Sequence, residues 1–547
     1  MRKLPLILGA SIITLLGAGH YLTWQTQSTL VAQPLEQMVA HINKKAGKDL
    51  VTLSFERKEQ AHYPSDPTVT YHNPTLIFNE PNNVAEVPIK SIALTGDLSM
   101  STSLLDRSST MNMTGMLELE GGDAAQPYKE RVSWDSFQGC RIQSADSHLA
   151  LLTGKSAFTT MHSPTDLLKA IQHAECSAQK LKIEDMLHNE TVFTAQSSNI
   201  IVDSSAHMAE TPKLSFNVAV KQMMFYYPLE QYKRDLSEMA SSLEFANEDA
   251  ARFITHLATK PMLPFIDPQK SGASDFVMQG ETEGDFAKEK PFPFSLTLTK
   301  LHSANKLMDI NLPFSIHATD ESTVEFTHDG TMRFDPAYAA LMEESVDILL
   351  EAAQDPALQL TPHTQALRDN LNIHALRNIM TVPLHDAGEI RTSFHLNVAP
   401  HAVNMKPLSI QTALFGIKAE ASITQNQNPP KYDGTVHLTN YAELIKRTSS
   451  LANDLSALSY SLGSSPMEQV VSDAAQTALV TFLGNLDTES NKLDNSALIT
   501  IASDAQGMPT ISQKPAMAVL IEAATQLAPH FPILTQMGIP SMGVAPQ

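Results

Sequence analysis

The sequence has little cysteine and little positive charge, and both shortages limit the classes of protein to which it can belong. Two cysteines in 547 residues cannot supply a disulfide framework, so the fold depends on ordinary hydrophobic cores. Lysine and arginine number 38 against 59 aspartates and glutamates, which gives a net charge of −21. The basic residues form no run that would neutralise phosphates, and we therefore expect no nucleic-acid partner. The length allows about two to four domains.

The common catalytic and cofactor-binding motifs are also missing. The chain contains no GxxxxGK or GxGxxG loop, no HExxH and no GxSxG, which are the signatures of nucleotide binding, zinc proteases and serine hydrolases. Its 20 histidines are scattered, and none has the spacing that places two ligands on one helix face. We predict a protein that is not an enzyme, with no catalytic residue, no cofactor and no metal site.

The first 28 residues predict export from the cytoplasm. Arg2 and Lys3 precede the uncharged stretch Leu4–Leu22, which as a helix would be about 28 Å long, close to the thickness of a bilayer core. Tyr21 and Trp24 would then lie at the far interface. This pattern favours a signal-anchor that holds the protein in the inner membrane through residues 4–22, with the N-terminus in the cytoplasm and the body in the periplasm.

Two other interpretations of the N-terminal segment stay open. Gly17 and Gly19 are spaced as in a cleavage site, although glycine at both places is a poor match. A cleaved signal peptide would release the protein into the periplasm, and a buried helix of a soluble protein is the third reading.

The cysteines agree with an exported chain. Cys140 and Cys176 lie 36 residues apart and can form one disulfide in an oxidising compartment. Two unpaired thiols are the alternative.

Short runs in which apolar and polar residues alternate dominate the exported part, and this period predicts half-buried β-strands. The clearest runs lie at residues 92–100, 214–220, 294–298, 308–312, 394–398 and 417–423. Amphipathic segments at 163–171, 229–257, 338–349 and 466–483 predict helices. At Gly115, before Met116, the alternation slips, which indicates a bulge. The predicted fold is α+β, with long antiparallel β-sheets and amphipathic helices packed on one face.

Three segments suggest a loose internal repeat of a hairpin followed by a helix. They are centred on Asp329-Gly330, Asp433-Gly434 and Gln506-Gly507, and each glycine is expected to form the turn of a hairpin. Chance similarity among three short segments is the alternative. A proline-rich stretch at 260–274 predicts the boundary between a first exported domain, 29–260, and a second, 275–547.

Methionine is the one residue type that suggests a binding surface, because flexible thioethers suit apolar grooves that accept variable partners. The candidate groove residues are Met100, Met111, Met113, Met223, Met224 and Phe225. Methionine in an ordinary core is the alternative explanation.

The chain resembles the YdgA-like proteins of Gram-negative bacteria and, more distantly, the AsmA-like envelope proteins. The resemblance rests on the start Arg2–Leu22, the alternating strands, and the segments Tyr432–Ile445 and Gly507–Met517. It implies an inner-membrane-tethered periplasmic protein without catalysis, and the AsmA-like relatives are associated with lipid handling. No site residue is carried over, because the shared features are architectural.

These observations lead to three hypotheses about function. The first is a non-catalytic envelope protein that binds a lipid or an apolar peptide in a groove of its sheet. The second is a structural or protein-interaction module that binds an envelope protein and no ligand. The third is an envelope hydrolase with a dispersed site, which requires a pocket where a nucleophile and a base converge.

Overall fold

The structure is a computed structural model. It describes residues 32–61, 67–79, 89–103, 107–122, 127–144, 171–205, 213–226, 268–284, 292–353, 372, 374–375, 377–379, 388–425, 429, 431–461, 471–488 and 495–527. The predicted anchor, the helix predicted at 229–257, most of the predicted domain boundary, and all of the helix predicted at 163–171 except Ile171 lie outside these residues. Ile171 is the first residue of a strand, so the prediction of a helix is wrong at that residue. Among the described helices, none is both long and apolar enough to cross a membrane.

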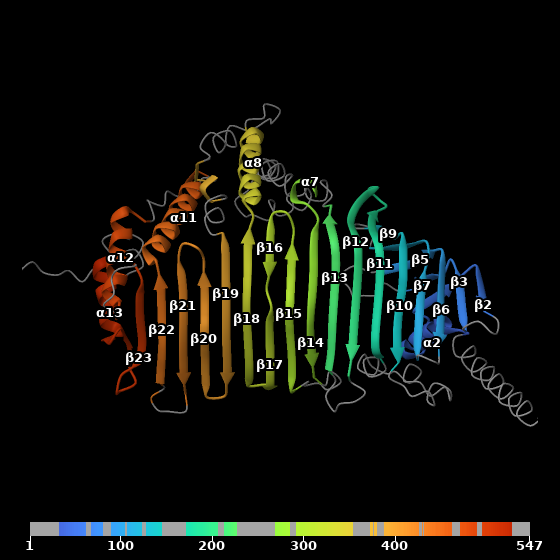
Figure 1. Ribbon diagram of the computed structural model, residues 1–547, viewed down its shortest axis with the longest axis horizontal. Coiled ribbons are helices and arrows are strands. Elements are labelled where there is room, and N and C mark those ends of the chain that lie inside the picture. The colour runs from blue at the N-terminus through green and yellow to red at the C-terminus, as the bar shows by residue number, and fades with distance from the viewer. Residues whose placement is uncertain are drawn as a thin grey trace, which may run out of the picture. The chain divides into compact units, whose positions relative to one another are not determined.

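The chain divides into two compact units. Unit 1 comprises residues 1–226 and 273–298, and unit 2 comprises residues 227–272 and 299–547. The strand at 274–283, which the sequence places in the second domain, therefore groups with the first unit. Antiparallel β-structure predominates in the described residues of both units, as the alternating pattern predicts, and helices are few (Figure 1).

In the residues that the structure describes, unit 1 is an antiparallel sheet preceded by one helix. Its elements are α2 (Pro34–Ala46), β1 (Val51–Ser54), β2 (Arg57–Gln60), β3 (Thr68–His72), β4 (Thr75–Phe78), β5 (Ile89–Thr95), β6 (Asp97–Ser103), β7 (Ser108–Met113), β8 (Met116–Gly122), β9 (Pro127–Ser133), β10 (Ser136–Ser144), β11 (Ile171–Asp185), β12 (Glu190–Ser204), β13 (Lys213–Phe225) and β14 (Ser274–Glu283). The strand β15 (Phe294–Ala304) begins in unit 1 and ends in unit 2.

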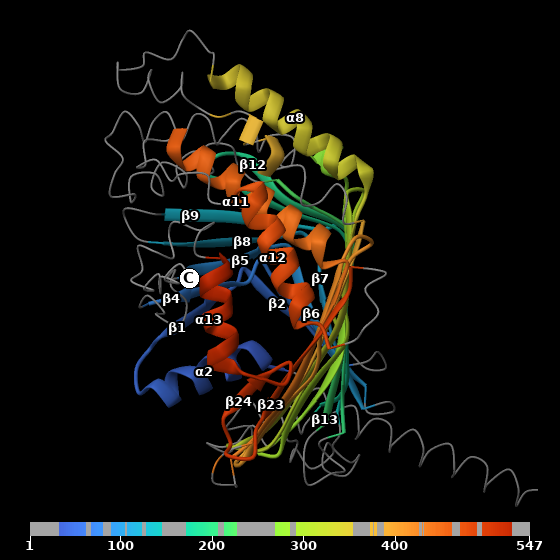
Figure 2. The same cartoon turned by 90° about the vertical axis from the view of Figure 1, so that its left-hand side faces the viewer.

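A crease crosses the first strands of unit 1. Five long strands are each interrupted after a few residues, so that β1 continues into β2, β3 into β4, β5 into β6, β7 into β8 and β9 into β10. The interruptions contain Asn73, Gly96 and Gly115, all with positive φ, and they are adjacent across the sheet. In Figure 2, β4, β5, β8 and β9 consequently run at a steep angle to β6 and β7. The irregularity predicted at Gly115 is one part of this crease.

The core of unit 1 lies in the bend. Val69, Tyr71, Leu94 and Leu98 are buried there, and Leu35 of α2 packs against them. The disulfide is also confirmed: Cys140 and Cys176 are bonded and lie directly opposite each other on β10 and β11.

Unit 2 is an antiparallel meander followed by helices. Its elements are α7 (Pro268–Ser271), β16 (Met308–Asn311), β17 (Phe314–Asp320), β18 (Thr323–Phe334), α8 (Pro336–Ala353), β19 (Glu389–Ala399), β20 (Ala402–Gln411), β21 (Gly416–Thr424), β22 (Lys431–Thr439), α11 (Tyr441–Ser461), α12 (Asp473–Leu486), β23 (Ala497–Ser503), β24 (Pro509–Ile511), β25 (Lys514–Pro515) and α13 (Ala516–Leu527). From β17 to β25, each strand pairs with the next one in the chain.

The main core of unit 2 forms where α11, α12 and α13 meet β22 and β23 (Figure 2). Its buried side chains are Leu438, Tyr441, Ile445, Phe482, Leu486, Ala497, Ile499 and Val519. The helix predicted at 466–483 is α12, which begins at Asp473 because Ser472 caps it: the Ser472 hydroxyl accepts a hydrogen bond from the Ala475 amide.

Two of the three predicted glycine turns are wrong. Gly330 and Gly434 lie inside the continuous strands β18 and β22, and neither has a positive φ. A Cβ at Gly330 would lie 2.6 Å from the His328 ring, and one at Gly434 would lie 2.8 Å from the Glu420 carbonyl oxygen. These glycines therefore allow close approach within a strand. Only Gly507, with φ of 77°, lies in the turn of a hairpin, between β23 and β24.

Candidate apolar binding site

One face of the unit 2 sheet carries an apolar row across eight strands. Residues that pair directly in an antiparallel sheet point to the same side. The directly paired positions from β17 to β24, which we call the apolar band, are Ile316, Phe326, Leu396, Met405, Ala421, Gly434, Ile501 and Ile511. All of them are half-buried except Ile501, which is exposed.

Exposure on this face rises with distance from the helical core. Along β23, Ala497 is 1% exposed, Ile499 9% and Ile501 36%, although all three point to the same side of the strand. The same trend is seen along β22, from Leu438 at 8% to Tyr432 at 36%. The residues that the structure describes thus bury one end of the face and leave apolar side chains accessible at the other.

A pocket opens on the same face between α11 and the loop that joins β20 to β21. Its volume is about 210 Å³. Apolar side chains dominate its lining, namely Ile390, Ile410, Leu414, Phe415, Leu444 and Leu451. We call it the α11 pocket. It is smaller than the roughly 300–1,000 Å³ typical of sites for drug-sized ligands, so it suits one apolar side chain or the end of one acyl chain.

The loop that forms one wall of this pocket is held in a defined conformation. The Thr412 amide donates to the Phe415 carbonyl oxygen at 2.9 Å, and the Thr412 hydroxyl accepts from the Phe415 amide at 3.1 Å. The side-chain amide of Asn440, just before α11, donates to the Leu414 carbonyl oxygen at 2.7 Å. The loop and the helix that face each other across the pocket are therefore tied together before any ligand binds.

Polar side chains of the pocket have partners of their own. Arg447 Nε lies 2.7 Å from Glu443 Oε1, one turn earlier on α11. The Asn378 side-chain amide lies 3.5 Å from an Asp454 carboxylate oxygen. These groups do not converge on a nucleophile, and the described part of the chain contains no group of three histidine, cysteine, aspartate or glutamate side chains able to hold a metal ion.

The structure brings together only half of the methionine set that the sequence indicates. Met100 and Met111 pair directly on β6 and β7, and Met113 lies two residues further along β7 on the same face. These three pack against the core of unit 1. Met223, Met224 and Phe225 instead lie at the end of β13.

At that end Phe225 is 65% exposed, and its ring centroid is 5.0 Å from that of Phe193. Met224 pairs with Thr194 and Met223 with Ser274. Met223 and Met224 are half-buried, so these residues form a separate group around the exposed Phe225 and do not continue the cluster on β6 and β7.

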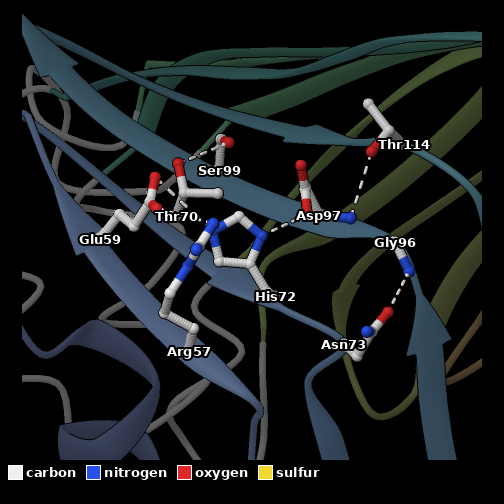
Figure 3. A network of polar contacts seen from close by, with 9 residues as sticks. All are labelled: Arg57, Glu59, Thr70, His72, Asn73, Gly96, Asp97, Ser99 and Thr114. Atoms are coloured by element: carbon white, nitrogen blue, oxygen red, sulfur yellow. Dashed lines mark hydrogen bonds and ion pairs between the residues drawn. The ribbon is translucent and has the colours of Figure 1, made fainter.

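A polar network at the crease is the other concentration of functional groups in unit 1 (Figure 3). His72 Nδ1 lies 2.7 Å from Asp97 Oδ1, and Arg57 lies 2.7 Å from Glu59. The Gly96 amide donates to the Asn73 side chain at 2.8 Å. The His72–Asp97 contact joins β3 to β6, and the Gly96–Asn73 hydrogen bond joins two of the interruptions, so both stabilise the crease.

The residues of the α11 pocket were not singled out by the sequence analysis. A signal existed, since Leu414 and Phe415 are large apolar residues in a short loop between two alternating strands, where polar residues are usual. The helical partners Leu444 and Leu451 look like ordinary core positions of an amphipathic helix, and only the fold shows that they face this loop.

Comparison with known proteins adds no assignment: no protein-family model matches the chain, and no curated protein does.

Proposed function

We propose that this protein is a non-catalytic, membrane-tethered component of the bacterial cell envelope that binds an acyl chain on the apolar face of unit 2. The observation that carries the proposal is the α11 pocket, an apolar cavity with a preformed wall. The end of one chain would occupy the pocket, and the rest would lie against the apolar band. An apolar peptide segment is the other occupant that the same surface fits.

The arrangement of helices supports this proposal. We infer that α11, α12 and α13 cover one face of the unit 2 sheet at one end, and that the uncovered part of that face is the binding surface. The passages from β18 to α8, from β22 to α11 and from β25 to α13 are then copies of one strand-then-helix unit. In each of them the helix follows its strand directly.

The membrane tether is the sequence-based part of the proposal. Residues 4–22 would hold the chain in the inner membrane, and a chain with a net charge of −21 would gain no attraction from anionic lipid headgroups. Deletion of residues 1–28, with an unrelated cleavable signal in their place, should move the exported protein from the membrane fraction to the soluble periplasmic fraction. If the full-length chain is already soluble there, the segment is a cleaved signal.

The ligand proposal is tested by filling the pocket. Titration of the full chain with a fluorescent fatty acid should give saturable binding, and Leu451→Trp should weaken it at least about tenfold because the indole occupies the space of the chain. Leu455→Trp is the matched control, since Leu455 is on the same helix, 49% exposed and outside the pocket lining. Equal binding by both variants, or none by the wild type, would exclude this site.

A protein-interaction module is the second candidate, and α13 favours it. Met517, Leu520 and Ile521 form an apolar stripe on this helix and are 62%, 58% and 47% exposed. A stripe of this kind is typical of a helix face that another protein covers. An envelope protein that co-purifies with the wild type and with Leu451→Trp, but not with a variant in which these three residues are changed to serine, would favour this alternative.

A further inference from the structure

Three methionines of unit 1 lie together on one face of β6 and β7. Met100 and Met111 are directly opposite on β6 and β7, so their Cβ atoms are about 4.5–5.5 Å apart. Met113 shares their face and is diagonal to Met100, about 7–8 Å away by the same geometry. Methionine has three rotatable side-chain bonds, so three thioether sulfurs starting from these positions can meet at one point.

The surroundings of this cluster restrict which ion it could take. All three methionines are half-buried, so an ion can reach them, and their neighbours in the cluster are the apolar or aromatic residues Val69, Tyr71, Leu94, Leu98 and Trp134. Glu36, the one acidic residue of α2, accepts hydrogen bonds from Tyr71 and Lys58. The next pair along this face, Thr102 and Ser109, carries hydroxyls that lie 3.3 Å apart and hydrogen-bond to each other. A set of three thioethers disfavours Mg²⁺, Ca²⁺ and Zn²⁺ and suits a soft monovalent ion.

The disulfide next to the cluster further restricts which metal ions the cluster could bind. Cys140 pairs directly with Met111 on its other side, and its sulfur is bonded to Cys176. Thiolates, which would otherwise be the strongest soft ligands, are therefore not available, and the sulfur ligands on this part of the face are thioethers. A thioether does not titrate and does not form disulfides, so it stays a ligand in an oxidising compartment.

An aromatic ring completes the arrangement. Trp134, in the turn between β9 and β10, packs against the same cluster as the three methionines. Its indole nitrogen is buried and has no hydrogen-bond partner in the described residues, so the ring is fixed by packing. A tryptophan face is the best aromatic partner for a cation.

We propose that Met100, Met111 and Met113 form a thioether site for Cu(I) or Ag(I) next to the indole of Trp134. The site is independent of the acyl-chain site of unit 2, because it uses other residues in the other unit. Methionine in an ordinary core is the alternative, and it requires no ion.

The experiment is a titration of the full chain with Ag(I) in chloride-free buffer, followed by tryptophan fluorescence. The chain has two tryptophans, so the background variant Trp24→Phe leaves Trp134 as the only reporter. We expect saturable quenching at one ion per chain, and the same stoichiometry for Cu(I) under anaerobic conditions. An excess of Zn²⁺ should cause no change.

Substitution by leucine removes the sulfur while nearly conserving volume, so the fold should be retained. Met111→Leu should weaken Ag(I) binding at least about tenfold, since even changes outside the ligand shell of a metal site cost this much. Met278→Leu, at a half-buried methionine of β14, is the matched control and should bind as the background variant does. Should Met111→Leu fail to fold, shifts of the three methyl signals in ¹³C-methionine-labelled unsubstituted protein decide the question. Absence of quenching, equal binding by Met111→Leu, or unshifted methyl signals would overturn the proposal.

Discussion

The close packing around Gly330 predicts a specific cost for adding a single methyl group. In Gly330→Ala the new Cβ would lie 2.6 and 2.9 Å from ring atoms of His328 and 2.9 Å from a methyl group of Leu312. The ring cannot turn away freely, because Nδ1 is 2.9 Å from the Pro313 carbonyl oxygen and Nε2 is 2.9 Å from the Thr392 hydroxyl. The protein must therefore be strained or lose these hydrogen bonds.

Overpacking of this kind costs about 1–3 kcal/mol. For a unit of this size each kcal/mol lowers the melting temperature by about 2–4 °C, which differential scanning calorimetry resolves. Gly416→Ala is the control, since its Cβ would lie 3.6 Å from Thr439, an ordinary contact, in a backbone conformation that alanine adopts. We expect it to be neutral or to raise the melting temperature slightly.

The result also separates a strand glycine from a turn glycine. A hairpin turn with positive φ would accept asparagine at position 330, because asparagine tolerates that conformation. At a strand position, Gly330→Asn should lower the melting temperature more than Gly330→Ala does, since the asparagine side chain is larger. A melting temperature of Gly330→Asn equal to that of the wild type would refute the reasoning.

Two further predictions concern unit 1. Burial alone would raise the pKa of Glu36, but hydrogen bonds from Lys58 and Tyr71 outweigh it and lower that pKa below its ordinary value of 4.5. Their contribution is present at neutral pH and is lost as the pH falls through the lowered pKa, so Tyr71→Phe should cost about 1.5–3 kcal/mol at pH 7 and less at pH 3 in urea unfolding. Replacing both Cys140 and Cys176 by serine should cost up to about 4 kcal/mol, since the bridge closes a loop of 36 residues, with the loss visible in hydrogen exchange of β10 and β11.

Controls for these predictions are available in the chain. Tyr432→Phe, at a side chain that is 36% exposed, should change stability by less than about 0.5 kcal/mol at either pH. A Tyr71→Phe effect that is the same at pH 3 and pH 7 would show that Glu36 is not the partner that matters. Unchanged exchange in the double serine variant would show that the strand pairing alone fixes this part of the sheet.

The sequence predicts the strands well because their signal is local. Alternation with a period of two follows from the need to bury one side of each strand, and it marks β5, β6, β13, β19 and β21 without knowledge of their partners. The disulfide was predictable once export was expected from the N-terminal segment, since each of two cysteines has only one possible partner.

Features that depend on the pairing register of the strands could not be predicted from the sequence. The dipeptides Asp329-Gly330 and Asp433-Gly434 have the composition of turns, but their environment is set by side chains and backbone on neighbouring strands. The methionines illustrate the same point. Met100, Met111 and Met113 meet because β6 pairs with β7 in one register, whereas nothing in the spacing of Met223 and Met224 shows that they lie elsewhere.

The α11 pocket could not be predicted from the sequence either. Its two walls come from a loop at 412–415 and a helix at 444–454, and their contact requires α11 to fold back over β20 and β21. Alternation predicts an apolar face of the sheet, but it does not predict which part of that face the helices cover, because the extent of helix cover is a tertiary property.

Photocrosslinking tests the central claim most directly. A fatty acid with a diazirine near the end of its chain is bound to the full-length protein, irradiated and located by peptide mass spectrometry. We predict that the label is found on the loop at 412–415 and on the α11 segment at 444–451, and that Leu451→Trp but not Leu455→Trp abolishes it. Labelling that is spread over other surfaces, or that is unchanged in Leu451→Trp, would contradict the account.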